Sequence, residues 1–330
     1  MKTELKNSLK LNRTLIILSF VCILLSIAAC VLGELVTPFI IGVLSVIYLF
    51  DAKSKHAFST IVSLILIGLN ATAILLKISV SMFAPTAIIL SFILVISFIK
   101  GQSKSDCSYV MTLIASAFSL IGYILFAMIE VGNFSLDAAV DFYSSLADAL
   151  RTVFVEGMME VYTAAGFEIT EEIVTVLFNQ QLNMIISYLI IGGFVIVGVG
   201  MKLFGWIVGY LSENNTHIKE WRFMPTKIYA YAYVILVVLS LFATASDSVF
   251  SISVSNLYNI FSIIFAYVGF GVVLGMLKKR MKPVFAVLAM LGILIVFASF
   301  VLQILAAIGV LFTVRINNLN SDSTNTDINS

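Results

Sequence analysis

Long blocks of apolar residues, each ended by a charge, a proline or an Asn/Ser cluster, restrict what this chain can fold into. Most blocks approach or exceed the roughly 20 residues with which an α-helix crosses a bilayer. Inside hydrocarbon, only α-helices and closed β-barrels satisfy all of their backbone hydrogen bonds. Barrel strands alternate apolar and polar residues, and these blocks do not. The sequence therefore predicts an all-α, polytopic transmembrane helix bundle.

Composition excludes several other classes of protein. Only 11% of the 330 residues are charged, against about 25% in a soluble globular domain. The net charge is +1 and no basic run alternates with aromatic residues, so we expect no nucleic-acid partner. Cys22, Cys30 and Cys107 form no CxxC pair, and they indicate neither a disulfide framework nor a zinc site.

The apolar blocks divide into about nine spans, although eight or ten also fit. We place the nine spans at 14–33, 36–50, 57–75, 82–99, 109–129, 183–211, 228–246, 256–277 and 283–312. The count varies because the last block is long enough to cross the membrane once with a tilt or to break near Gln303.

Residues 130–181 differ in character from the rest of the chain. They hold nine of the 18 acidic residues and one basic residue, Arg151. Apolar residues recur at helical spacing from Leu136 to Val161, with aspartates on a different face, which predicts an amphipathic helix. Gly166 fits the C-cap of this helix, and Thr170 fits the N-cap of a second helix.

Lysines and arginines set the expected orientation. With the N-terminus in the cytoplasm, nearly every basic loop lies inside and residues 130–181 lie outside. The expected organisation is a basic N-terminus at 1–13, a transmembrane half at 14–129, an extracytoplasmic acidic helical insert at 130–181, a second transmembrane half at 182–315 and a disordered tail at 316–330. We expect the chain to reside in the cell membrane.

Few polar residues fall inside the expected spans, and these are the candidates for a substrate or ion pathway. Lys202 lies in the sixth span, where it either extends to the interface or acts as a buried ligand or counter-ion. Asn70 and Gln303 either make helix–helix hydrogen bonds or contact a substrate.

Glycines at helical spacing mark close helix contacts. Gly205 and Gly209 stand in the sixth span, and Gly271 and Gly275 in the eighth. Small residues at this spacing let two helix backbones approach closely. Two interpretations are open: internal packing of the bundle, or docking of a partner membrane subunit.

Catalysis finds no support in the sequence. His56 and His217 lie in different loops, and no HExxH, GxSxG or Walker motif is present. We therefore expect a protein that is not an enzyme and that binds no metal or cofactor.

One stretch carries a family resemblance. The acidic helix leads through GFEITEEI into a glycine-rich span, and a short loop with Trp221, Arg222 and Pro225 opens the next one. This order resembles the YybS-like family of bacterial membrane proteins, which carry a domain of unknown function and a "WRLP" motif in that loop. The present chain has one extra residue before the proline. The family's hydropathy is similar to that of substrate-binding subunits of energy-coupling-factor transporters, which dock a partner subunit through small-residue faces.

Two functions are compatible with these features. The leading hypothesis is a small-molecule binding or transport component without its own energising domain. The alternative is a scaffold that transports nothing and recruits partners in envelope, division or sporulation processes. A polar pocket beneath the acidic insert would favour the first, and an apolar interior with an exposed apolar stripe on the 136–161 helix would favour the second.

Overall fold

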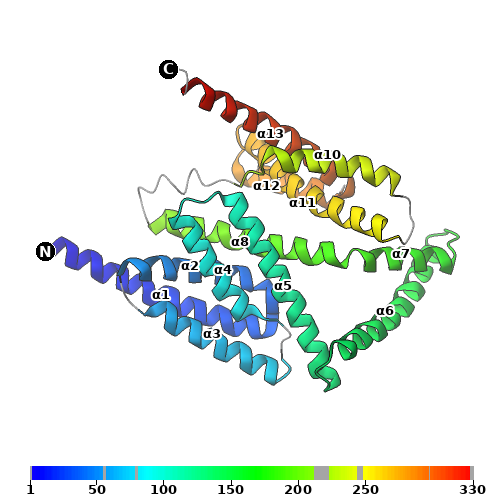
Figure 1. Cartoon of the computed structure of the whole chain (residues 1–330), viewed down its shortest axis with the longest axis horizontal. Coiled ribbons are helices and arrows are strands. Elements are labelled where there is room, and N and C mark those ends of the chain that lie inside the picture. Colours follow the sequence, from blue (N-terminus) through cyan, green and yellow to red (C-terminus); the bar gives the residue numbers. More distant parts are fainter. Residues whose placement is uncertain are drawn as a thin grey trace. The chain divides into compact units, whose positions relative to one another are not determined.

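The computed structural model describes residues 2–54, 57–78, 81–211, 223–243, 248–296 and 298–327. Every regular element in these ranges is a helix (Figure 1). The α-helices are α1 (Lys2–Leu32), α2 (Thr37–Ser54), α3 (Phe58–Leu75), α4 (Phe83–Ile99), α5 (Lys104–Val131), α6 (Leu136–Ala164), α7 (Glu171–Asn183), α8 (Ile185–Leu211), α10 (Lys227–Phe242), α11 (Val249–Lys278), α12 (Pro283–Val296) and α13 (Ala298–Asp327).

Six of the described helical segments are long and apolar enough to cross a membrane. They are Arg13–Leu35, Phe58–Leu75, Lys104–Val131, Ile185–Leu211, Val249–Lys278 and Phe300–Asn317. Three shorter apolar helices accompany them, at Thr37–Ala52, Phe83–Ile99 and Lys227–Phe242. These segments confirm the predicted all-helical, multi-pass class, whereas the number of crossings stays a prediction.

The chain forms two compact units. Unit 1 comprises Met1–Gln181 and Gly192–Arg222, and unit 2 comprises Leu182–Ile191 and Phe223–Ser330. The second transmembrane half predicted from residue 182 stays a prediction, and most of α8 packs with the N-terminal helices. The reason is a set of close helix contacts that only glycine permits.

These contacts lie where α8 meets α5 and α2 inside unit 1. A Cβ atom on Gly193 would stand 2.5 Å from Ser116 Oγ and 2.9 Å from the Thr112 carbonyl oxygen. A Cβ atom on Gly200 would stand 3.2 Å from the Pro38 carbonyl oxygen. Between membrane helices, tight packing rather than the hydrophobic effect provides the attraction, so these glycines fix where α8 can lie.

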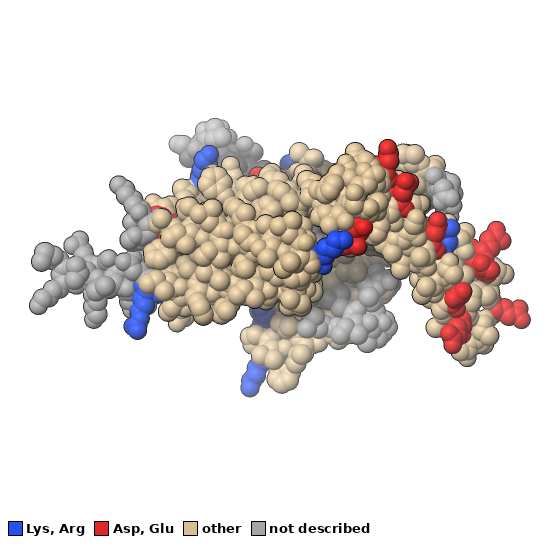
Figure 2. All heavy atoms as spheres, turned by 90° about the horizontal axis from the view of Figure 1, so that it is seen from below, with Lys and Arg blue, Asp and Glu red and all other residues tan. Residues whose placement is uncertain are grey.

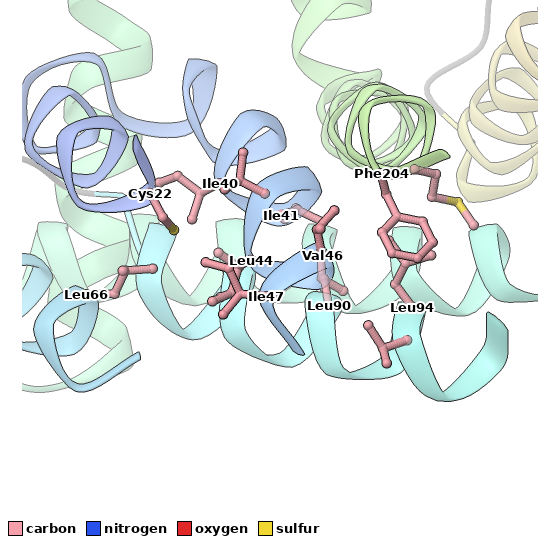
Figure 3. Close-up of a cluster of buried hydrophobic side chains, with 14 of the residues drawn as sticks. Cys22, Ile40, Ile41, Leu44, Val46, Ile47, Leu66, Leu90, Leu94 and Phe204 are labelled. Atoms are coloured by element: carbon pink, nitrogen blue, oxygen red, sulfur yellow. The ribbon is translucent and has the colours of Figure 1, made fainter. Parts of the chain in front are cut away.

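Helix α2 forms the centre of unit 1. Ile40, Ile41, Leu44 and Ile47 are fully buried, and side chains of α1, α3, α4 and α8 point toward them (Figure 3). A helix with apolar residues around its whole circumference is stable when other helices surround it. The interior of unit 1 is therefore a continuous packed cluster of aliphatic and aromatic side chains.

The strongest contact in unit 2 is the antiparallel crossing of α11 and α13. A Cβ atom on Gly269 would collide with the carbonyl oxygen of Leu305, and one on Gly309 with the carbonyl oxygen of Phe265. Because 269 pairs with 305 while 265 pairs with 309, the two helices run in opposite directions. The backbones touch at this crossing, as small-residue contacts between membrane helices do.

One expectation for the C-terminal part needs correction. The predicted span 283–312 falls on α12 and α13, which are separated by residue 297, outside the described residues. The predicted disordered tail begins at residue 316, whereas α13 continues to Asp327. No Gly or Pro follows Gly309 to stop the helix, and extending an existing helix is far easier than starting one.

Candidate functional site

The most distinctive element outside the candidate membrane spans is the pair of helices α6 and α7, which are joined by a turn at Gly166 and which we call the acidic hairpin (residues 136–183). The Ser135 hydroxyl caps α6 by accepting from the Ala138 N–H at 3.1 Å. Gly166 has a φ of 77°, and the Phe167 N–H donates to the Tyr162 carbonyl at 2.9 Å. This is the left-handed glycine end predicted from the sequence. Thr170 accepts from the Ile173 N–H at 3.4 Å, which also confirms the predicted start of α7.

Aromatic contacts hold the hairpin to the end of α5 and to itself. The Tyr143 hydroxyl donates to the Tyr123 carbonyl at 2.8 Å, and Phe142 meets Phe126 edge to face with centroids 6.0 Å apart. Burial raises the pKa of the Tyr143 phenol. The ring centroids of Phe154 and of Phe178 in α7 lie 5.4 Å apart. The acidic hairpin therefore packs at a defined position on α5.

The two faces of the acidic hairpin differ sharply. One face of α6 exposes an aliphatic stripe made up of Leu136, Val140, Leu146, Leu150, Val153 and Val161, with exposed fractions between 41% and 69%. The hairpin also exposes the carboxylates of Asp137, Asp141, Asp148, Glu156, Glu160, Glu168, Glu171 and Glu172. The three aspartates lie on a different side of α6 from the stripe, whereas Glu160 follows Val153 by seven residues and lies at the edge of the stripe. Figure 2 shows acidic side chains gathered at the end of the molecule where Figure 1 places α6 and α7.

Asn70 is the one predicted pathway residue that the structure buries. Its exposed fraction is 3%. The side-chain amide donates to the Ser81 carbonyl at 2.8 Å, and its oxygen accepts from the Ala84 N–H at 3.3 Å in the first turn of α4. The first turn of a helix has N–H groups without partners, so Asn70 caps α4 from the neighbouring helix α3. These contacts agree with the interpretation that Asn70 makes helix–helix hydrogen bonds.

Replacing Asn70 with leucine should destabilise unit 1 by about 1–3 kcal/mol, because a buried carbonyl and a buried N–H lose their partner. The temperature at which the buried thiols of Cys22 and Cys107 react with a maleimide dye measures this loss. Thr72, which is exposed on the same helix, gives the control: Thr72→Leu should leave the reaction temperature nearly unchanged. If both variants behave like the natural protein, the capping role is wrong.

Lys202 and Gln303 have exposed side chains. Lys202 is close enough to Lys104, at the start of α5, for the two charges to interact. The Lys202 side chain is exposed near the end of a candidate span. This agrees with the interpretation that it extends to the membrane interface. Gln303 lies in the first turns of α13. Unit 1 holds Lys202 and Asn70, and unit 2 holds Gln303.

The predicted small-residue sites have few neighbours within the chain. Gly209, Gly271 and Gly275 would each meet nothing within 4 Å if a Cβ were added, and Gly205 is half-buried. Gly209, Gly271 and Gly275 therefore make no close helix contact within the described residues. Docking of a partner subunit at these glycines stays a prediction. The packing glycines are Gly193, Gly200, Gly269 and Gly309 instead.

The loop motif is partly outside the described residues, because Trp221 and Arg222 both fall there. Pro225 is described, and its carbonyl oxygen accepts from Asn317 Nδ2 at 3.2 Å. Asn317 also donates to the Thr313 carbonyl at 2.8 Å. The start of α10 is thereby joined to α13 within unit 2.

Sequence reasoning missed a polar network in unit 2. Asn256 Oδ1 accepts from the Ser187 N–H at 2.9 Å, and Asn256 Nδ2 donates to the Asn183 carbonyl at 2.7 Å. Asn259 Nδ2 lies 3.1 Å from Ser187 Oγ and donates to it. The network joins α11 to the junction of α7 and α8. Two asparagines one turn apart at the start of an apolar block were the available signal.

A small hollow lies between the ends of α3, α4 and α5. It is lined by Ile74, Lys77, Met82, Gly122, Leu125, Phe126 and Ile129, and it offers about 10 Å³ to the centre of a water molecule. That volume is about the least that holds one ordered water. Lys77 at its edge pairs with Glu130 at 3.4 Å. The hollow is apolar and too small for a vitamin-sized ligand.

Within the part of the chain that the structure describes, no group of three or more His, Cys, Asp or Glu side chains could hold a metal ion. No family model, curated protein or solved structure matches the chain. The function must therefore be argued from the geometry of the helices and the hairpin.

Proposed function

We propose that this chain is a membrane scaffold that presents its acidic hairpin, outside the membrane, to a basic partner protein. One observation carries the proposal: the hairpin is capped and packed, yet eight of its carboxylates are exposed to solvent. Arg151 engages one of them, Asp148, at 3.0 Å. A fixed array of like charges steers a partner of opposite charge toward it and aligns that partner.

The packing of unit 1 supports the same proposal. Its centre is filled by α2 and its neighbours, and the hollow between the ends of α3, α4 and α5 is apolar and about the size of one water. The basic loops at the opposite ends of the spans favour a cytoplasmic N-terminus and an extracytoplasmic hairpin in the cell membrane. The proposed activity involves no catalysis and no cofactor, and YybS-like membership is part of the same proposal.

Photo-cross-linking tests the partner proposal. A photo-reactive residue at Ser145, which is exposed on the polar side of α6, should give one discrete adduct in intact membranes. The adduct should disappear when Asp137, Asp141, Glu156 and Glu160 become amides, and at about 1 M salt, where charges are screened beyond roughly 3 Å. This set of substitutions leaves the Asp148–Arg151 pair intact. A missing adduct, or one insensitive to both changes, overturns the proposal.

Small-molecule binding is the second candidate, and the polar network around Asn256 is the observation that favours it. Half-helix ends joined to polar side chains form the binding sites of many transporters. Thermal melting of the purified protein against vitamins, nucleobases, amino acids and metal ions tests this candidate. A ligand at 100 times its Kd stabilises a protein by about 2.7 kcal/mol. A clear hit that is lost in Asn259→Leu would replace the scaffold with a binding component.

A further inference from the structure

The aliphatic stripe of α6 stays largely exposed within the described part of the chain, although Tyr143 and Phe154 on the same side of the helix contact α5 and α7. Its six side chains, Leu136, Val140, Leu146, Leu150, Val153 and Val161, remain between 41% and 69% exposed. They follow one side of a 29-residue helix, which is roughly 44 Å long at 1.5 Å per residue. An exposed apolar strip of this length marks a contact with lipid or with another protein.

Exposed apolar side chains also occur on α5, the candidate span that precedes α6. Leu113, Leu120 and Ile121 of α5 are exposed by 63%, 48% and 44%, and α5 is one of the helices long enough to span a membrane. Phe134, in the turn after α5, is 74% exposed. Val131 at the end of α5 is 49% exposed and Leu136 opens α6, so exposed apolar side chains stand on both sides of the turn.

Both ends of the acidic hairpin join candidate membrane-spanning helices through short connections. Four residues, Gly132 to Ser135, separate α5 from α6. At the other end α7 stops at Asn183, and the candidate span Ile185–Leu211 begins two residues later. A helix attached in this way lies within reach of the headgroup region and needs no further attraction to arrive there.

The chemistry of the stripe favours lipid over protein. All six side chains are leucine or valine, whereas the centres of protein–protein interfaces are enriched in Trp, Tyr and Arg. Asp137, Asp141 and Asp148 lie on a different side of the same helix. A helix with one aliphatic and one charged face lies in the plane of the interface with its apolar face in the acyl–headgroup boundary.

We propose that α6 is an interfacial helix that rests its aliphatic stripe in the lipid surface beside the end of α5 and turns Asp137, Asp141 and Asp148 toward water, with Glu160 at the edge of the stripe. This arrangement sets the orientation of the acidic face without any partner. It goes beyond the proposed scaffold function, because it concerns lipid contact in a membrane that contains this chain alone.

Spin labels on two matched pairs test the proposal. Leu150 and Val161 lie on the stripe, while Thr152 and Thr163 are exposed polar residues two positions further on, about 200° around the helix. Each site carries one cysteine in a background with Cys22, Cys30 and Cys107 replaced by alanine. The labelled protein is reconstituted into phosphatidylcholine vesicles, and collision with oxygen and with a water-soluble nickel complex is measured. The background should first melt like the natural protein.

We expect the stripe labels to collide with oxygen severalfold more than with the nickel complex, and the threonine labels to show the reverse. Equal nickel access at both members of each pair would place α6 in water and overturn the proposal. Stripe labels shielded from both reagents would show protein on the stripe and would also overturn it. Neither result bears on the charge-dependent adduct at Ser145, so the two proposals fail separately.

Discussion

Replacing Gly309 with leucine should destabilise unit 2 by about 3 kcal/mol or more, the upper range of overpacking costs. The Cβ of any larger residue would strike the Phe265 carbonyl oxygen, and a backbone group cannot turn aside as a flexible side chain can. The α11–α13 crossing would have to open, which removes the closest packing in the unit. Loss of the monodisperse peak in size-exclusion chromatography after heating measures the effect.

Gly271→Leu is the matched control for this crossing. Gly271 lies two residues from Gly269 on the same helix, and a Cβ there would meet nothing within 4 Å. Both substitutions replace glycine with leucine inside a helix, so they change helix propensity equally. The difference between their effects on stability therefore measures the helix contact. We expect Gly271→Leu to retain its peak close to the natural temperature. If Gly309→Leu and Gly271→Leu melt together, the crossing does not stabilise unit 2.

Gly193→Leu should have the second largest effect, a loss of about 2–3 kcal/mol from unit 1. The added side chain would press on Ser116 Oγ and on the Thr112 carbonyl oxygen of α5, at 2.5 and 2.9 Å from its Cβ. The serine can turn, but the carbonyl cannot, so α8 must move away from α5. The buried thiols of Cys22 and Cys107 should then react with a maleimide dye at a clearly lower temperature.

Gly192 provides a control one position away. It is exposed, and a Cβ there would meet nothing within 4 Å. Gly192→Leu should therefore leave the thiol reaction temperature almost unchanged, and in a bilayer its side chain would simply face lipid. Equal reaction temperatures for the two neighbouring variants would contradict the α5–α8 contact.

The acidic hairpin shows how much of a candidate site the sequence can predict. Gly166 and Thr170 act as predicted because helix caps depend on a few neighbouring residues. The apolar stripe of α6 is also visible in the spacing of its residues. What the stripe contacts is a different question, since periodicity reports that a face is apolar and says nothing of its neighbour.

The polar residues show the opposite case. Asn70 and Asn256 both stand in apolar blocks, and nothing in their local sequence separates them from Gln303 or Lys202. Their roles depend on which helix end lies opposite: the first turn of α4 for Asn70, and the α7–α8 junction for Asn256. Such partners are many residues away along the chain, so local patterns do not reveal them.

The sequence by itself determined that this protein is helical, that it resides in a membrane and that one acidic hairpin is amphipathic. Each of these follows from the spacing and length of apolar runs and from short-range caps. The tertiary structure alone decided which glycines make contacts. Gly193 and Gly269 face a backbone while Gly192 and Gly271 face open space, although all four are the same residue in similar surroundings in the sequence. The physical reason is that a close contact belongs to two helices, and only their packing determines which side of each one is covered.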